Sequence, residues 1–389
     1  MDQITAVINA NLYPVSSPPI ERGVLLFAGS KILQIGENIP VPNEAIVLDA
    51  SGKVIVPGFI DAHTHIGIWG EWYGQPEYDG NEGSNPVTAG VRAIDAVWPG
   101  HFAFQDARSG GVTCVQITPG SGNVIGGETV VIKTSGTVAD DMVVRNPAGM
   151  KAALGENPKG SYGSRGRAPK TRMGIASILR SSLMKAREHM RKLESAGADP
   201  SKQPDTNLDM LSLTKVLNKE IPLRVHAHRA DDIVTAIRIA EEFGIDYSIE
   251  HCTDGATVAE FLGKKQARVN VGPSMWSRAK IETLNISAKT PGILARAGCK
   301  VSIISDHPFH PIQFLSTAAA VAWANGMAKE EALRAITLTP AETLGIEDRV
   351  GSLEPGKDAD FTIWTGHPFQ IRSKIESVFL EGKNVPVQD

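Results

Sequence analysis

The sequence of 389 residues has few cysteines and no long apolar run. Three cysteines, Cys114, Cys252 and Cys299, are too sparse for a disulfide framework, so we expect buried free thiols in a reducing compartment. No stretch of about 18 apolar residues occurs, which argues against a membrane-spanning helix. The first residues lack a basic segment followed by an apolar one, so no secretory signal peptide is expected. These features together predict a cytoplasmic protein.

The sequence also lacks blocks of like charge. It has 39 Lys and Arg against 43 Asp and Glu, and the net charge is −4. Without a basic patch, we expect neither a nucleic-acid surface nor a charged membrane-binding surface. The composition, 42% hydrophobic and 21% charged, is ordinary for a globular enzyme that acts on a small molecule. It is compatible with a homo-oligomer and does not require one.

Short strand-like segments occur at both ends of the chain. TAVINANLY, GVLLFAG and AIVLDA lie within the first fifty residues, and they are separated by Pro, Gly and Asn. The C-terminal segments DADFTIWTG and IESVFLEGKNVPV have the same character. Neither set has enough strands to be stable alone. We therefore predict one small β-sandwich domain built from residues 1–56 and 347–389.

Strand and helix patterns alternate through the middle of the chain. PLRVHAHR reads as a strand, and the amphipathic helix ADDIVTAIRIAEEFG follows it. DYSIEHC, ARVNVGP and KVSIISDHP are further strands with helical sequence after each. Such alternation is typical of parallel strands joined by helices, so we predict an α/β fold with a (β/α)8 TIM barrel over residues 57–346. Residues 156–215 fit poorly and are predicted to be an insertion over the barrel mouth, beginning with a long loop.

Polar side chains that bind metals follow apolar strands at four places. His63 and His65 end the strand VIVPGFIDA, and alternate strand residues project together. One such pair alone is equally compatible with ordinary hydrogen-bonded histidines. The C-terminal strand ends of a barrel form one face, and imidazole with carboxylate is a typical ligand set for Zn²⁺. The further members of this predicted metal site are His226, His228, His251 and Asp306.

These segments resemble those of the amidohydrolase superfamily. The likeness covers nearly the whole chain, and it is nearest to the branch of imidazolonepropionase and the barrel prolidases. It implies a metal-dependent hydrolase that cleaves a C–N bond in an amide, cyclic amide or dipeptide-like small molecule by attack of metal-bound hydroxide. The segments that carry the likeness are PGFIDAHTH (57–65), VHAHR (225–229), IEHC (249–252), ISDHP (304–308) and GSLEPGKDADFTIW (351–364).

The resemblance also implies roles for particular residues. His63, His65 and His226 correspond to metal ligands. His251 corresponds to a second-metal ligand or a catalytic group. Asp306 corresponds to the aspartate that binds metal and accepts a proton from the attacking water.

Two positions bear on the reaction and on the number of cations. Many deaminase-type relatives carry Glu three residues after the fifth-strand histidine, and here Arg229 stands there, which makes deaminase chemistry less expected. For the bridging group of two-metal relatives, Lys151 in AGMKAALGE is the candidate and Glu156 the alternative. Lys151 is equally compatible with a solvent-facing position. Because three histidines and Asp306 already fill a site, we expect one Zn²⁺ or similar divalent transition metal, and two only if Lys151 is carboxylated.

Some residues near the strand ends are candidates for substrate binding. His228 and Arg229 are expected to contact substrate, since a guanidinium pairs well with a carboxylate. Arg229 has the alternative of pairing with Asp231. The Gly-rich GSGNVIGGE (120–128) lacks the lysine of a P-loop and reads as a tight loop at the active site. Three aromatic residues either line a substrate pocket or pack under a loop: Trp69, Trp72 and Tyr73.

Alternative functions are compatible with the same fold. One is a deacetylase or deaminase of the same superfamily. Another is a catalytically silent scaffold, which would be expected to have lost strand-end ligands. The presence of His63, His65, His226, His251 and Asp306 favours an enzyme. The substrate class is implied by the resemblance alone, because one fold serves many reactions.

Overall fold

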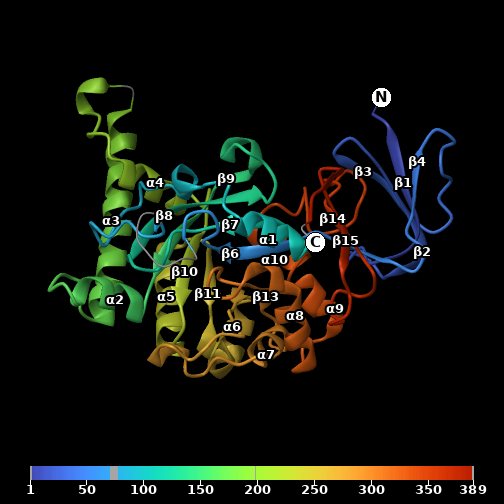
Figure 1. The fold of residues 1–389 in the computed structure, drawn as a ribbon. Coiled ribbons are helices and arrows are strands. Elements are labelled where there is room, and N and C mark those ends of the chain that lie inside the picture. Colours follow the sequence, from blue (N-terminus) through green and yellow to red (C-terminus); the bar gives the residue numbers. More distant parts are fainter. Residues whose placement is uncertain (1, 71–77, 198, 388–389) are drawn as a thin grey trace.

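The computed structural model describes residues 2–70, 78–197 and 199–387. Two eight-stranded sheets organise this part of the chain, one forming a barrel and the other holding strands from both ends (Figure 1). Among the described residues, no helix has both the length and the apolar composition needed to cross a bilayer.

The barrel sheet runs from β6 to β13 in sequence order. Seven of its strands are parallel, and β8 runs antiparallel to β7 and β9. The two edges approach each other, since the His65 N–H donates to the His307 carbonyl at 2.9 Å and the Asp306 N–H to the His63 carbonyl at 3.2 Å. The predicted barrel is confirmed. Strands β8 and β9 pair as an antiparallel hairpin in place of a third strand–helix unit. Its strands are β6 (Phe59–Thr64), β7 (Val112–Ile117), β8 (Ile125–Lys133), β9 (Val143–Ala153), β10 (Leu223–Ala227), β11 (Tyr247–His251), β12 (Arg268–Val271) and β13 (Lys300–Ile303).

Helices cover the outside of the barrel. The amphipathic pattern predicted between β10 and β11 forms α5 (Ala230–Phe243), which buries Ile233 and Ile237 and ends at Gly244 with φ 67°. Only glycine adopts this left-handed conformation at little cost, so it ends the helix cleanly. The other helices are α1 (Ala103–Ser109), α2 (Glu156–Gly163), α3 (Arg172–Ala196), α4 (Leu208–Leu217), α6 (Ala259–Lys264), α7 (Thr290–Arg296), α8 (Leu315–Ala324), α9 (Lys329–Arg334) and α10 (Leu338–Leu344).

Residues 156–215 are mostly helical. The long loop expected at the start of this segment is wrong for Glu156–Gly163, which forms α2. The long helix α3 begins at its cap Thr171, whose side chain accepts the Gly174 N–H, and it buries Leu179 and Leu183 one turn apart. It packs against α4 and α5, on the side of the barrel away from the terminal strands (Figure 1). That this segment is an insertion over the barrel mouth stays a prediction.

Strands from both ends of the chain share the second sheet. Its order is β16-β15-β14-β5-β1-β2-β3, with β4 paired to β1, and β14 lies antiparallel to β5. Phe27, Phe361 and Phe379 form an aromatic cluster in its core, with ring centroids 4.5–5.6 Å apart. The division into domains after residues 56 and 346 stays a prediction. The strands are β1 (Ile4–Leu12), β2 (Ile20–Ala28), β3 (Lys31–Gly36), β4 (Ile46–Asp49), β5 (Val54–Pro57), β14 (Phe361–Trp364), β15 (Ile375–Leu380) and β16 (Lys383–Val385).

A cluster of charged side chains joins the barrel to this terminal sheet. Lys133, at the end of β8, is buried between Asp358 and Asp360, which precede β14. Its Nζ lies 3.0 Å from Asp358 Oδ2 and also pairs with Asp360. Lys31 and Arg349 reach the same Asp358 carboxylate at 2.8 and 2.9 Å. Buried charges of this kind are tolerated only when they are paired.

Candidate active site

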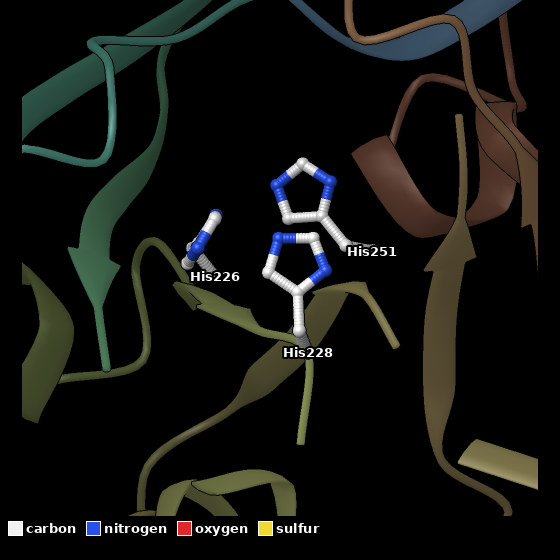
Figure 2. A group of neighbouring side chains, drawn as sticks. All are labelled: His226, His228 and His251. Atoms are coloured by element: carbon white, nitrogen blue, oxygen red, sulfur yellow. The ribbon is translucent and has the colours of Figure 1, made fainter. Parts of the chain in front are cut away.

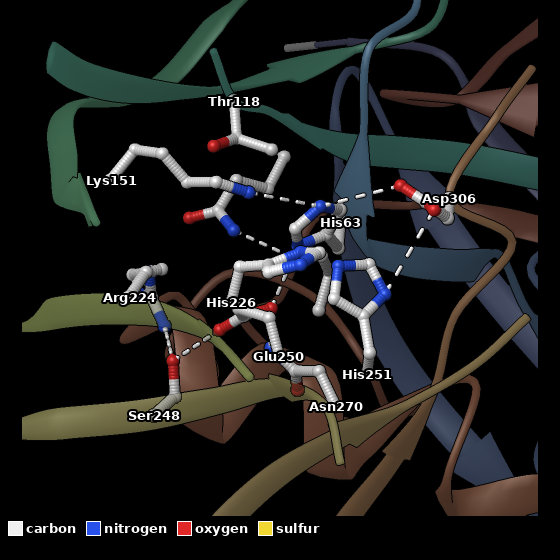
Figure 3. A network of polar contacts seen from close by, with 12 residues as sticks. His63, Thr118, Lys151, Arg224, His226, Ser248, Glu250, His251, Asn270 and Asp306 are labelled. Carbon is white, nitrogen blue, oxygen red and sulfur yellow. Dashed lines mark hydrogen bonds and ion pairs between the residues drawn. The ribbon is translucent and has the colours of Figure 1, made fainter. Parts of the chain in front are cut away.

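The carboxyl ends of three barrel strands and the segment after β13 bring the predicted site residues together (Figure 3). The five histidines and Asp306 of the predicted metal site are buried, and the most exposed of them is Asp306 at 7%. Their ligand atoms form two groups that share His251, and within each group these atoms lie within 4.8 Å of one another. The first group is His63, His251 and Asp306; the second is His226, His228 and His251.

His65 adjoins the first group, because its Nε2 lies 3.3 Å from Asp306 Oδ1. His63 Nε2 lies 3.5 Å from the same oxygen. The structure does not place His226 within this first group. His226 instead contacts His251, which belongs to both groups, at 4.4 Å between ring centroids.

Hydrogen bonds fix which nitrogen carries the proton on the three rings around Asp306. Nδ1 of His63 bonds to the Glu250 carboxylate at 2.8 Å, and Nδ1 of His65 bonds to the Thr118 carbonyl at 2.7 Å. Nδ1 of His251 bonds to the Gly272 carbonyl at 2.9 Å. These partners can only accept hydrogen bonds, so each Nδ1 carries the hydrogen and each Nε2 keeps a lone pair.

Burial keeps the rings of His63 and His251 neutral. It lowers the pKa of His63 to about 4, and it lowers the pKa of His251 well below its ordinary value. The lone pair of His63 Nε2 therefore faces Asp306 Oδ1 with no proton to share, while the His251 nitrogen nearest the carboxylate is Nδ1, 3.9 Å from Asp306 Oδ2. His251 Nε2 and Asp306 Oδ1 have no hydrogen-bond partner among the described residues.

Glu250 holds His63 from inside the barrel. Its Oε2 accepts from His63 Nδ1 and from Asn270 Nδ2 at 2.9 Å, while Oε1 accepts from Ser248 Oγ (Figure 3). Burial alone would raise the pKa of Glu250, but the hydrogen bond from His63 and the nearby Arg224 guanidinium lower it to about 2. A charged carboxylate behind a ligating histidine fixes its ring and increases its basicity.

Left-handed backbone occurs at two site residues. His251 has φ 70° and Asp306 has φ 54°, a region that residues with a side chain rarely adopt. Both lie where a strand ends at the mouth of the barrel. Such strain persists when the surrounding structure supports it and concentrates at functional sites. Here it lets Glu250 and His251, neighbours in one strand, both reach His63, at 2.8 Å and at 4.8 Å between ring centroids.

The second group is packed ring on ring. His228 and His251 stack with centroids 4.7 Å apart, and His226 meets His228 edge-on at 4.6 Å (Figure 2). Ser121 Oγ lies 2.8 Å from His226 Nδ1, so the Gly-rich loop reaches the site as predicted. Thr253 Oγ1 lies 2.7 Å from His228 Nδ1. These hydroxyls orient both rings with Nδ1 away from the group.

Lys151 lies in strand β9 and is fully buried, so the solvent-facing position considered from the sequence is wrong. Its Nζ is 3.3 Å from His63 Nε2. Burial lowers the pKa of Lys151 to about 8, which increases its uncharged fraction. Glu156, the alternative bridging residue, begins α2, and its N–H bonds to the Glu282 carboxylate.

Glu282 is a site residue that the sequence reasoning missed. It lies in the 3-10 turn Ile281–Thr283 after β12, and its exposed fraction is 2%. Its Oε1 lies 3.8 Å from His226 Nε2 and 4.0 Å from His228 Nε2. Burial raises the pKa of Glu282. No periodic pattern surrounds this residue, so no sequence signal distinguished it from a surface glutamate.

Other missed residues are the hydrogen-bond partners of the histidines. Glu250 was hidden because strand alternation places it opposite His251, and only the left-handed backbone brings both to His63. The remaining partners act through loop positions or carbonyl groups, which leave no residue-type signal: Thr118, Ser121, Thr253 and Gly272.

The predicted substrate-binding residues lie in different surroundings. His228 is buried in the second group. The Arg229 side chain is 42% exposed and pairs with Asp231 at 2.9 Å, the alternative considered for it, and no described contact joins it to the histidines. Trp69 lies 4.9 Å from the His65 ring, between centroids, and it lines a cavity of about 290 Å³. Trp72 and Tyr73 lie outside the described residues.

The side chains present fit a divalent metal. Neutral imidazole nitrogens and a carboxylate are the donors that Zn²⁺ and similar cations prefer. His251 Nε2 and Asp306 Oδ1 are buried acceptors without a donor among the described residues, which costs free energy unless a cation lies beside them. A His and Asp cluster at this position can therefore hold a metal ion.

A family model supports the same assignment. Residues 183–385 match the model of the Amidohydrolase family, which is more than half of the chain. The chain belongs to the amidohydrolase family. A hydrolase is therefore the class of enzyme expected from the sequence and confirmed here.

Curated relatives of this amidohydrolase include two enzymes. The amidohydrolase tasK of Hapsidospora irregularis is 28% identical over 93% of this chain, which spans 39% of the length of tasK. The imidazolonepropionase of Rhizobium rhizogenes is 24% identical, over 97% of this chain and 94% of that enzyme.

Solved structures share the fold of this amidohydrolase. A crystal structure of an amidohydrolase from Thermotoga maritima MSB8 is 42% identical, covers 99% of this chain and 100% of its own, and superposes with a TM-score of 0.95. A prolidase complexed with N-methylphosphonate-L-proline superposes with a TM-score of 0.63, at 19% identity over 99% of this chain and 100% of its own. The second likeness shows the fold alone.

Proposed function

We propose that this amidohydrolase cleaves a C–N bond in an amide, cyclic amide or dipeptide-like small molecule with the help of bound divalent cations, Zn²⁺ in the first instance. The observation that carries the proposal is the approach of His63 Nε2 and His65 Nε2 to Asp306 Oδ1, at 3.5 and 3.3 Å, with His251 in the same group of ligand atoms. When bound, such a cation lowers the pKa of a water molecule toward ~7 and polarises a carbonyl group. The class of substrate is supported by the imidazolonepropionase relative.

Asp306 is proposed to move the proton. Its Oδ1 accepts no hydrogen bond among the described residues, so it is free to take a proton from the attacking water. As the water oxygen bonds to the carbonyl carbon, that proton goes to Asp306. When the C–N bond breaks, Asp306 delivers it to the leaving nitrogen, so the carboxylate is regenerated.

The histidines and the cavity have complementary roles in this proposal. His63, His65 and Asp306 hold one cation, with His251 between this group and the second. His226 and His228 belong to the neighbouring group, where His228 faces the substrate or the cation. The cavity of about 290 Å³ beside them accepts the rest of a small substrate. It has aromatic side chains and amides in its wall, namely Trp69, Tyr78, Tyr162, Asn81, Asn123 and Asn157.

The surroundings of Lys151 favour two bound cations rather than the single cation expected from the sequence. A buried amine 3.3 Å from a histidine lone pair has no ion pair among the described contacts. Its neutral form can add CO₂, which forms an N–C bond and releases one proton, and the resulting carboxylate can bridge two cations. We therefore propose that Lys151 is carboxylated in the loaded enzyme.

Metal analysis followed by a substrate screen tests this function. Protein expressed with ample metal should contain at least one equivalent of a transition metal. The loaded protein should hydrolyse members of a set of N-acyl amino acids, dipeptides and cyclic amides, and the metal-free protein should not. Well under one equivalent of every transition metal would overturn the metal-dependent mechanism. Release of ammonia from aminopurines or aminopyrimidines, with no amide cleaved, would favour the deaminase alternative.

A further inference from the structure

A carboxylate oxygen of Glu282 is buried beside the second histidine group without a hydrogen-bond donor. Its Oε1 has no hydrogen-bond partner among the described residues. The other oxygen, Oε2, accepts the Glu156 N–H at 2.8 Å, which fixes the orientation of the carboxylate. Oε1 is thereby directed at His226 Nε2 and His228 Nε2, 3.8 and 4.0 Å away. An imidazole N–H bonded to this oxygen would lie at about 2.7–3.2 Å, so no such bond exists.

The nitrogen of His226 that faces Glu282 carries a lone pair. Lys280 Nζ donates to Asn157 Oδ1 at 2.7 Å, so the amide group of Asn157 must present its N–H to the other side. That side is His226 Nε2, 3.5 Å from Asn157 Nδ2. The nitrogen therefore accepts, and it meets Glu282 Oε1 as one electron-rich atom facing another.

The neighbouring basic side chains do not occupy the space between these atoms. Arg172 bonds through Nε to Asp232 at 2.9 Å and reaches Glu282 only on its Oε2 side, at 3.7 Å. Lys280 Nζ lies 4.0 Å from Oε1 and is already engaged with Asn157. Two ligands of one cation with bonds of ~2.1 Å are separated by about 3.4 Å in tetrahedral geometry. The observed separations of 3.8 and 4.0 Å are somewhat longer than this value, so the carboxylate and the rings would approach one another slightly to share a cation.

We infer that Glu282 is a ligand of a divalent cation held by the second group, with His226 and His228 as its partners. The turn Ile281–Thr283 thus supplies a metal-binding carboxylate that no strand end contributes. This inference rests on the proposed metal dependence. It adds a residue that determines how tightly the second cation is bound.

The test is a titration of metal-free protein with Co²⁺ against a competing chelator, with the visible d–d absorption as the second readout. Glu282→Gln preserves the acceptor for the Glu156 N–H, because an amide oxygen replaces Oε2, and it removes the anionic oxygen that faces the histidines. We expect it to weaken one class of bound Co²⁺ by at least tenfold and to change its absorption. The class held by His63, His65 and Asp306 should keep its affinity.

Asp232→Asn is the matched control. It removes one negative charge from the same cluster, but Asp232 contacts Arg172 and no histidine in the described contacts. We expect Co²⁺ affinities within about twofold of wild type. Equal effects of the two variants would show that Glu282 acts only through the net charge of the cluster and would overturn the inference. The inference would also be overturned if Glu282→Gln bound every equivalent of Co²⁺ with an affinity within twofold of that of the wild type.

Two further results keep the test decisive. If Glu282→Gln does not fold, the structure of wild-type protein loaded with Zn²⁺ decides: an Oε1–metal distance near ~2.1 Å supports the ligand role, and one beyond about 3 Å overturns it. If wild-type protein binds no Co²⁺ or Zn²⁺ at all, the proposed function fails as well. Co²⁺ bound at the first group alone would overturn only the role of Glu282.

Discussion

Glu250 provides the sharpest test of how the barrel interior tunes a site residue. We compare two substitutions. Glu250→Gln can place its amide oxygen where Oε2 now accepts from His63 Nδ1 and Asn270, and it can donate its N–H to Ser248. It therefore keeps the hydrogen bond and loses the charge. Glu250→Leu loses both, and leaves the His63 N–H buried without an acceptor.

The magnitudes follow from the contacts. A hydrogen bond to a charged group contributes about 1.5–3 kcal/mol and a neutral one about 0.5–1.5 kcal/mol. Glu250→Gln should therefore lower the affinity for Zn²⁺ by about 1 kcal/mol, or roughly fivefold. Glu250→Leu should lower it by about 1.5–3 kcal/mol, roughly tenfold to a hundredfold, because the His63 ring also loses its fixed proton position.

The assay is competition for Zn²⁺ between metal-free protein and a chromogenic chelator. Glu128→Gln is the control, because Glu128 is also buried but pairs with Lys215 at 2.7 Å on the outside of the barrel. It should bind Zn²⁺ as wild type does. A Glu250→Leu variant with a Zn²⁺ affinity within twofold of wild type would refute the reasoning. A larger loss of Zn²⁺ affinity for Glu250→Gln than for Glu250→Leu would refute it as well.

Three further predictions follow from other contacts. Asp306→Asn should reduce kcat by about 10²–10⁴ with little change in the unfolding midpoint, and activity within tenfold of wild type would contradict its proton transfer. Lys151→Met should reduce bound metal to one equivalent or less by elemental analysis; two retained equivalents would exclude a bridging carboxylate on Lys151. Lys133→Met should lower the free energy of unfolding by about 3–5 kcal/mol, since it leaves two carboxylates buried without their shared cation. Lys31→Met, which removes a 48% exposed partner of Asp358, should cost under about 1 kcal/mol, and similar losses for both in denaturant titrations would refute this ranking.

The barrel and its strand-end residues could be predicted because they are local patterns. His63 and His65 follow an apolar strand at alternate positions, and His226, His251 and Asp306 each come directly after another. Parallel strands bring their carboxyl ends to one face, so sequence position fixed the location of these side chains. The terminal strands were likewise visible as short β-rich segments. That the two sets share a sheet followed from the reasoning that neither is stable alone. The partner of β14 is β5, Val54–Pro57, which the sequence pattern had joined to the first barrel strand.

The parts that could not be predicted depend on contacts between distant segments. Lys151 lies in a short apolar run that fits a strand or a helix, and burial on both sides of β9 decides its environment. The segment Glu156–Gly163 contains Gly and Pro and reads as a loop, yet its first N–H is bound by Glu282, more than a hundred residues away. Glu282 itself lies in a turn whose position is set by the barrel, not by its own sequence.

The pairing of β5 with β14 has a consequence for how the chain is made. β5 is synthesised before β14, and this strand, which covers its edge, begins about 300 residues later. At about 5–20 residues per second, that edge waits on the order of 15–60 s for its partner. It carries Ile55 and Val56, which are fully buried in the finished sheet. An uncovered apolar strand edge is a template for pairing with other chains. During this interval the nascent protein reaches its final sheet only if such pairing is slow or if chaperones prevent it.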